Sequence, residues 1–129
     1  MNVNVPQIQR ASVPAQRHLS ALLAIQESLF APTASLSTVM AEICYRAATF
    51  VEGDGATIEL QEGDELVYRS TWGTMAPFLG FRIKRAGSLS GLAVATGNVM
   101  LCEDSEEDPR VDRAACRKVG CRSMLIVPL

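Results

Sequence analysis

The sequence predicts an α+β domain in which an antiparallel sheet is backed by helices, and three observations support this fold class. Apolar residues recur every three or four positions through residues 17–51, which is typical of amphipathic helices. The period then changes to two, in two strands separated by the turn sequence Glu62-Gly63-Asp64. Residues 87–129 finally predict a helix, a strand, an acidic loop, a helix and a strand, with start and stop signals at the helices.

The size and charge of the chain limit the class of protein. A length of 129 residues allows one domain with a modest core. The net charge of −2 gives no field that would attract nucleic acid or an anionic membrane. The apolar runs are too short to span a bilayer, and the N-terminus lacks the apolar core of a signal peptide. We therefore expect a cytoplasmic protein with neither nucleic-acid nor membrane partners.

The N-terminal part of the chain predicts a leader and a first helix. Residues 1–16 carry two prolines among polar residues without a period, which favours a flexible leader before a folded domain at 17–129. A helical pattern then begins, and Pro32 is expected to end it. Two interpretations stay open: this helix packs on the core, or it is a dimer or signalling helix. The pattern consists of Leu19, Leu22, Leu23, Gln26, Leu29 and Phe30.

The second helix is predicted from Ser35, a candidate N-cap, to a stop at Gly53 or Gly55. Its apolar face holds Leu36, Val39, Met40, Ile43, Ala47 and Val51. The strands come next, because Ala56, Ile58 and Leu60 alternate with polar residues and Glu65–Thr71 forms the return strand. The aromatic-rich segment 72–81 breaks the pattern, and a short strand is expected around Phe81 and Ile83.

The second half of the chain carries the clearest signals for where helices begin and end. Ser88 is expected to cap a helix that Gly97 ends, and residues 99–102 predict a strand. The pair Asp108-Pro109 is a typical helix start, a capping carboxylate followed by proline, and Gly120 is the expected stop. The apolar stretch 123–129 predicts a strand at the centre of the sheet.

The four cysteines predict reduced thiols. They are Cys44, Cys102, Cys116 and Cys121, and an intracellular setting disfavours disulfides. A zinc site is not expected, because the chain has no CxxC pair and its one histidine, His18, is remote in sequence. Buried packing is the first interpretation, and a thiol switch at Cys116 and Cys121, which bracket a helix end, is the second.

The order of these elements resembles a GAF domain over residues 18–129, with the segments GATIELQEGDELVYRSTWG, RAGSLSGLAVATGNVMLCED and DPRVDRAACRKVGCRSMLIVPL. The resemblance implies a GAF/PAS-like antiparallel sheet backed by helices. It implies a non-catalytic, small-molecule-sensing module of a bacterial signalling protein, similar to those ahead of cyclic-di-GMP turnover or histidine-kinase domains. A homodimer, a downstream output domain and a small-molecule ligand are then expected partners. The ligand and any cofactor are unknown.

The resemblance also places a ligand pocket between the sheet and the segments 72–81, 88–90 and 104–111. Trp72 either stacks on a flat ligand or packs in the core, and Asp108 either binds a ligand or caps a helix. Arg110 either faces an anionic ligand or lies on the surface. The residues that the resemblance assigns to the ligand are Trp72, Phe78, Phe81, Ser88, Ser90, Cys102, Asp104, Arg110 and Val111.

Departures from the family's known subtypes leave the ligand open. Free methionine sulfoxide reductases have cysteine where Ser90 stands and glutamate where Met124 stands, so an enzyme of that kind is the less favoured alternative. No Cys-His pair is present for a bilin, and Val111 replaces a phenylalanine of related sequences. A further alternative is a ligand-free dimerisation module, with a collapsed pocket filled by Trp72, Phe78 and Phe81.

The resemblance finally predicts that the chain is incomplete at its C-terminus. GAF domains continue beyond the VPL strand with a closing strand and a C-terminal helix. Without them, backbone groups beside Ile58 and Leu60 would lack partners. The expected explanations are a fragment or truncated reading frame, or a strand supplied by a second copy.

Overall fold

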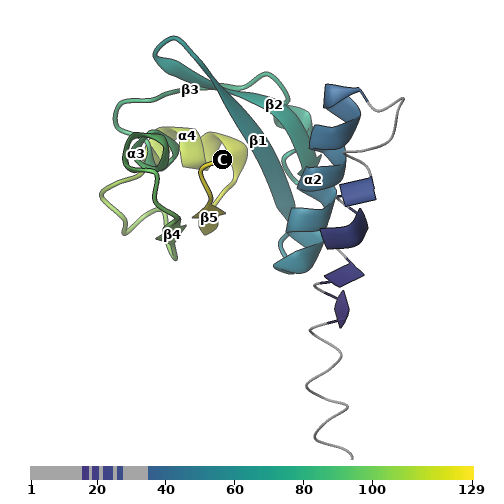
Figure 1. Ribbon diagram of the computed structural model, residues 1–129. Coiled ribbons are helices and arrows are strands. Elements are labelled where there is room, and N and C mark those ends of the chain that lie inside the picture. Colours follow the sequence, from purple (N-terminus) through teal and green to yellow (C-terminus); the bar gives the residue numbers. More distant parts are fainter. Residues whose placement is uncertain (1–15, 18, 21, 25, 28–34) are drawn as a thin grey trace, which may run out of the picture. The chain divides into compact units, whose positions relative to one another are not determined.

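The structure is a computed structural model that describes residues 16–17, 19–20, 22–24, 26–27 and 35–129. The chain divides into two compact units, each described here by itself. The first unit comprises the described residues up to Thr57 together with Ser70–Ala76, and the second comprises Ile58–Arg69 together with Pro77–Leu129. Figure 1 labels the helices and strands.

The first predicted helix is confirmed where it is described. Residues 16–17, 19–20, 22–24 and 26–27 are helical, and Leu19 and Leu22 expose 59% and 64% of their surface. Pro32, Leu29 and Phe30 lie outside the described residues. This high exposure leaves both interpretations of the leucine stripe open.

Helix α2 spans Leu36–Phe50 and begins at the predicted cap, because the Ser35 side chain accepts a hydrogen bond from the Thr38 N–H. Its buried residues are Cys44 and Ala48. The predicted glycine stop is wrong: the helix ends at Val51, and Glu52 takes the left-handed conformation with φ of 55°.

The reason lies in the terminal hydrogen bonds of α2. The Glu52 N–H donates to the Thr49 carbonyl over 3.3 Å, and the Gly53 N–H donates to the Ala48 carbonyl over 2.8 Å. These two bonds are the Schellman pattern, which satisfies the free carbonyls of a helix end. The non-glycine residue therefore accepts a conformation that costs about 1–2 kcal/mol.

The first sheet has the strand order β1-β2-β3. Strand β1 spans Gly55–Glu62, β2 spans Glu65–Gly73 and β3 spans Arg82–Lys84, and a short 3-10 turn at Ala76–Phe78 precedes β3. The hairpin turn at residues 62–65 is confirmed. Strands β2 and β3 pair antiparallel, with Leu66 opposite Ile83, and both side chains are buried.

The second sheet corrects the predicted place of the C-terminal strand. Strand β4 spans Met100–Cys102 and β5 spans Met124–Ile126, and they pair antiparallel as a two-stranded sheet. Within the described residues β5 is not central, since β4 is its only neighbour. Leu101 and Leu125 lie opposite each other and are 59% and 51% exposed. The apolar stretch 123–129 therefore predicted a strand buried on both faces, whereas only one face of β5 is covered.

The two helices of the second unit are α3, Leu89–Thr96, and α4, Arg113–Val119. The predicted bounds of α3 are confirmed, with Ser88 as N-cap and Gly97 as its left-handed stop. The predicted start of α4 is wrong. Its cap is Asp112, four residues after Asp108, and the Asp112 carboxylate accepts the Ala115 N–H over 3.0 Å.

The core of the second unit forms where α3 packs on β4 and β5. Its buried centre consists of Leu89, Cys102 and Val111. Met100, Cys116, Met124 and Ile126 pack around it. The inward residues of the two short strands thus alternate with the exposed ones, as expected for a sheet covered on one face. In the described part of the chain, no helix is long and apolar enough to cross a membrane.

Candidate functional site

Two open grooves of the second unit meet at Pro109 and Arg110. One encloses about 600 Å³ and the other about 700 Å³. The first is lined by Leu101, Glu103, Asp104, Glu107, Asp108, Pro109 and Arg110. The second is lined by Gly63, Asp64, Arg85, Ala86, Gly87, Ser88, Gly91, Leu92, Ala95, Pro109 and Arg110. Three of the predicted site residues therefore line the grooves: Asp104 the first, Ser88 the second and Arg110 both.

Arg110 is held rigidly at the junction of the two grooves. Its guanidinium donates to both carboxylate oxygens of Asp108, over 2.6 and 2.9 Å, and to the Leu101 carbonyl over 2.8 Å. The hydrogen bonds from Arg110 hold the pKa of the Asp108 carboxyl well below its usual range, and Asp108 raises the pKa of Arg110. Asp108 thus orients Arg110 and balances its charge, and the same carboxylate accepts the Arg110 backbone N–H over 2.9 Å in a turn that precedes α4.

Cys102 and Val111 lie in the core beneath the grooves. Cys102 is fully buried, and burial raises the pKa of its thiol, with a further contribution from the neighbouring Asp108 carboxylate. Val111 is 8% exposed and packs in the same cluster. Neither residue lines a groove, and both have a packing role in the core of the second unit.

Ser88 lines the second groove and is also the N-cap of α3. Its hydroxyl accepts a hydrogen bond from the Gly91 N–H over 3.1 Å and donates to the Arg85 carbonyl over 3.2 Å. Ser90 is buried in the first turn of α3 and does not line the grooves. The Ser88 hydroxyl is therefore used in capping, the structural role that its position in the sequence predicts.

The predicted aromatic residues are not brought to the grooves. Phe81 forms edge-to-face contacts with Tyr68 and Phe78, at centroid distances of 5.5 and 6.4 Å, and the Lys118 ammonium lies 5.3 Å from its centroid. These contacts give Phe78 and Phe81 a packing role in the second unit. Trp72 belongs to the first unit, where it makes an edge-to-face contact with Tyr45 at 5.6 Å.

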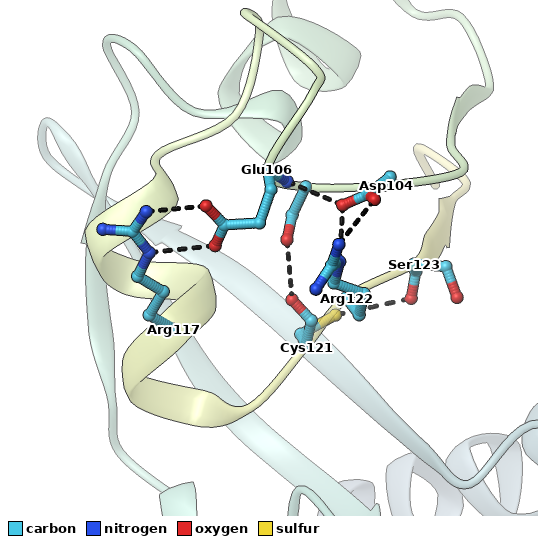
Figure 2. A network of polar contacts seen from close by, with 7 residues as sticks. Asp104, Glu106, Arg117, Cys121, Arg122 and Ser123 are labelled. Carbon is cyan, nitrogen blue, oxygen red and sulfur yellow. Dashed lines mark hydrogen bonds and ion pairs between the residues drawn. The ribbon is translucent and has the colours of Figure 1, made fainter.

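The acidic loop, residues 103–108, is attached to the segment 117–122 by polar contacts that sequence reasoning missed (Figure 2). The Arg122 guanidinium donates to both oxygens of Asp104, over 2.5 and 2.7 Å, and that of Arg117 to both oxygens of Glu106, over 2.6 and 2.9 Å. The basic residues 117, 118 and 122 that follow the acidic run were the available signal. The described residues contain no group of three or more His, Cys, Asp or Glu side chains placed to hold a metal ion.

The backbone completes this attachment. Ser105 is 2% exposed, its N–H donates to the Arg122 carbonyl over 2.7 Å, and its hydroxyl donates to the Cys121 carbonyl over 3.1 Å. The wall of the first groove, which includes Asp104, is therefore positioned by residues that immediately follow α4.

The Asp104–Arg122 pair predicts a specific loss of stability in acid. Its hydrogen bonds with Arg122 lower the pKa of Asp104, so the stabilisation is present above the unfolded pKa of about 3.9 and is lost as the pH falls through the lower folded pKa. We expect Arg122→Ala to lower the melting temperature slightly at pH 6. Between pH 4 and pH 2, the melting temperature of the variant should fall less steeply than that of the unaltered chain. Thermal melts of the variant across this range test it. Lys84→Ala is the control, because it removes an exposed cation of β3 that is not one of those lowering the pKa of Asp104 or Glu106. Identical pH profiles for Arg122→Ala and the control would contradict the prediction.

Comparisons with known proteins agree with this fold. The sequence model of one family, described as GAF domain, matches residues 33–129. The GAF domain from a Coxiella burnetii phosphoenolpyruvate-protein phosphotransferase is similar in structure, with a TM-score of 0.72 and 21% identity, over 88% of this chain and 70% of that one. The A. aeolicus nlh2 GAF domain in an inactive state has a TM-score of 0.67 and 11% identity, over 82% of this chain and 65% of that one.

A third similar structure is the GAF domain from an Acinetobacter phosphoenolpyruvate-protein phosphotransferase, with a TM-score of 0.61 and 18% identity. The similarity covers 72% of this chain and 60% of that one. No curated protein gives a significant match. The family model covers about three quarters of the sequence, and the solved structures share its α+β arrangement of antiparallel strands and helices. The chain therefore belongs to the GAF domain family.

Proposed function

We propose that this chain is a regulatory, non-catalytic module that senses a small molecule in a cytoplasmic signalling protein of bacteria. The observation that carries the proposal is the pair of grooves that share Arg110: Asp104 lines the first groove with it, and Ser88 lines the second. A ligand there would contact a fixed guanidinium, a carboxylate and apolar walls from Leu92, Ala95 and Leu101. Such a mixture of apolar area and a few oriented polar groups is typical of small-molecule sites.

Two nucleophile candidates among the predicted site residues, Ser88 and Cys102, support a non-catalytic role. The Ser88 hydroxyl is occupied as a helix cap, and the Cys102 thiol is fully buried with a raised pKa. A thiol acts as a nucleophile in its deprotonated form, which burial disfavours. Binding would then act by shifting the population of groove-wall conformations, and an output domain of the signalling protein would respond to that shift.

Native mass spectrometry of the gently purified chain tests the proposal. We expect a stoichiometric small-molecule adduct that is lost in Arg110→Gln and retained in Arg113→Gln, a matched change of an exposed arginine outside the grooves. Circular dichroism confirms that both variants are folded. An adduct that is retained in Arg110→Gln would show that the binding site lies outside the grooves. A chain without an adduct under all conditions would contradict the proposed sensing of a small molecule.

A second candidate function is a dimerisation module, and one observation favours it. The outward face of β4 and β5 and its flanking residues expose the apolar side chains Val99, Leu101, Leu125 and Val127, each by more than half. Contiguous exposed apolar side chains mark interaction surfaces. A dimer without any adduct in the same spectra, broken by Leu125→Lys and unaffected by Leu79→Lys, would select this function. Leu79 is the matched control because it is 64% exposed and lies outside that face.

A further inference from the structure

The end of α4 has a geometry that brings two cysteines together. The Cys121 N–H donates to the Cys116 carbonyl over 2.9 Å, and the Gly120 N–H donates to the Arg117 carbonyl over 3.3 Å. Gly120 is left-handed, with φ of 70°. This is the Schellman pattern, which frequently brings the side chain of the residue after the left-handed position next to that of the residue five places before it. In this chain those two residues are Cys121 and Cys116.

The hydrogen bond sets an upper limit on the separation of the two residues. With standard bond lengths on either side of a 2.9 Å contact, the Cα atoms of Cys116 and Cys121 are at most about 7 Å apart. Disulfides usually join Cα atoms about 4.4–6.8 Å apart. The backbone of the helix end is therefore compatible with the spacing that a disulfide needs.

Exposure separates this pair from the other cysteines. Cys44 and Cys102 are buried, with 1% and 0% of their surface exposed, whereas Cys116 and Cys121 are both half-buried. Reagents dissolved in water therefore reach the pair first. Cys121 raises the pKa of Cys116 electrostatically, ahead of Cys102, whose thiol is buried in the core.

We propose that Cys116 and Cys121 form a reversible disulfide when the protein meets an oxidising low-molecular-weight disulfide such as oxidised glutathione. The thiolate of one cysteine attacks a sulfur of that reagent and releases one thiol, leaving a mixed disulfide on the protein. The second cysteine then attacks the protein sulfur of the mixed disulfide and releases the second thiol. The two protein protons pass to the two released thiols, so that two cysteines are oxidised as one reagent disulfide is reduced.

The disulfide would reach the groove through contacts already described. The Cys121 carbonyl accepts the Ser105 hydroxyl, and the next residue, Arg122, holds Asp104 in the wall of the first groove (Figure 2). Cross-linking the end of α4 restricts the segment to which the acidic loop is attached. The effect on ligand binding rests on the proposed function, whereas the disulfide itself does not.

The rate of disulfide formation is expected to depend strongly on pH. Burial raises the pKa of the Cys116 thiol to about 11, and Cys121, Cys102, Asp112 and Glu106 add to this effect. Burial also raises the pKa of Cys121. Since the thiolate is the reacting form, oxidation is expected to be slow at pH 7 and to accelerate about tenfold for each pH unit up to pH 9.

Incubation of the full chain with excess oxidised glutathione, followed by acid quenching, tests the proposal. We expect the intact mass to fall by two hydrogens. Trypsin cuts after Arg113, Arg117, Lys118 and Arg122, so the disulfide would join the peptides 114–117 and 119–122 into one species that reducing agents separate. Cys121→Ser and Cys121→Ala should instead keep a glutathione adduct on Cys116, and Cys44→Ser should behave as the unaltered chain.

Three results would overturn the proposal: a disulfide that includes Cys102, stable glutathione adducts on both cysteines, or thiols still reduced after long incubation at pH 9. The link to the groove has a separate readout, because hydrogen exchange at the Ser105 and Glu106 amides is expected to slow on oxidation. Unchanged exchange in a chain with the disulfide would refute the link alone. Loss of ligand binding with no disulfide would concern the proposed function instead.

Discussion

A Gly91→Ala variant is expected to be destabilised by about 2 kcal/mol or more, although alanine is the better helix former. In a helix interior, alanine gains about 0.5–1 kcal/mol over glycine. A Cβ at position 91, however, would lie 1.7 Å from the Arg85 carbonyl oxygen and 2.6 Å from the carbonyl carbon. These are backbone atoms, so no rotamer change relieves the clash, and overpacking of this kind typically costs about 1–3 kcal/mol or more.

The same contact explains why the effect should reach the second groove. The Arg85 carbonyl accepts the Ser88 hydroxyl, and the Arg85 N–H donates to the Asp64 carbonyl over 2.8 Å. Glycine at position 91 therefore lets α3 approach the segment 85–88, which forms one wall of that groove. Urea unfolding measures the loss of stability. If mass spectrometry identifies a ligand, a weaker affinity of the variant for it would show that this groove wall has been displaced.

Gly97→Ala is the matched control, because Gly97 ends the same helix with φ of 67° and no atom lies within 4 Å of a Cβ built there. Its cost should come from backbone conformation alone, about 1–2 kcal/mol. If Gly91→Ala costs no more than Gly97→Ala, the close approach of α3 to the Arg85 backbone is not as the structure has it.

The elements that sequence reasoning predicted correctly are those with local causes. Ser88 caps α3 and Gly97 ends it, and the hairpin turn at residues 62–65 follows from residue types that favour turns. Each of these signals acts within four residues of its effect. Tertiary contacts do not alter these signals, so the amino-acid sequence alone is sufficient to predict the helix cap, the helix end and the turn.

The errors came where a residue has a distant or competing partner. Asp108-Pro109 and Asp112 are both plausible helix starts, and the local sequence cannot show that the Asp108 carboxylate is taken by the Arg110 guanidinium. Likewise the stop of α2 at Glu52 depends on two terminal hydrogen bonds and not on a glycine.

The candidate site was predictable only in part for the same reason. Of the residues that the resemblance assigns to a ligand, Asp104 and Arg110 line one groove and Ser88 and Arg110 line the other. The ion pair of Asp104 with Arg122, however, joins residues 18 positions apart. Neither charge pattern nor periodicity specifies which arginine meets which carboxylate. That choice depends on how the acidic loop folds back on the residues after α4, a tertiary contact that no local signal encodes, although Gly120 is the predicted end of that helix.

Leu89→Ala is expected to lose about 2–5 kcal/mol, the range for deleting a buried leucine side chain. Leu89 is 2% exposed and packs with Cys102 and Val111 at the centre of the second unit. Leu92 is 36% exposed on the same helix, so Leu92→Ala should cost less than about 1 kcal/mol. Urea unfolding of the two variants provides the comparison.

A second readout distinguishes a cavity from a general loosening of the fold. Leu89 covers Cys102, whose thiol is fully buried, so its removal should speed the reaction of Cys102 with a thiol reagent under native conditions. Cys44, buried in the first unit, should keep its rate and serves as the internal control. Equal acceleration at both cysteines would show global unfolding, whereas acceleration at Cys102 alone would show that Leu89 supports the floor beneath Arg110. The groove junction and the core would then be one structural element, since Asp108 contacts Cys102 on one side and Arg110 on the other.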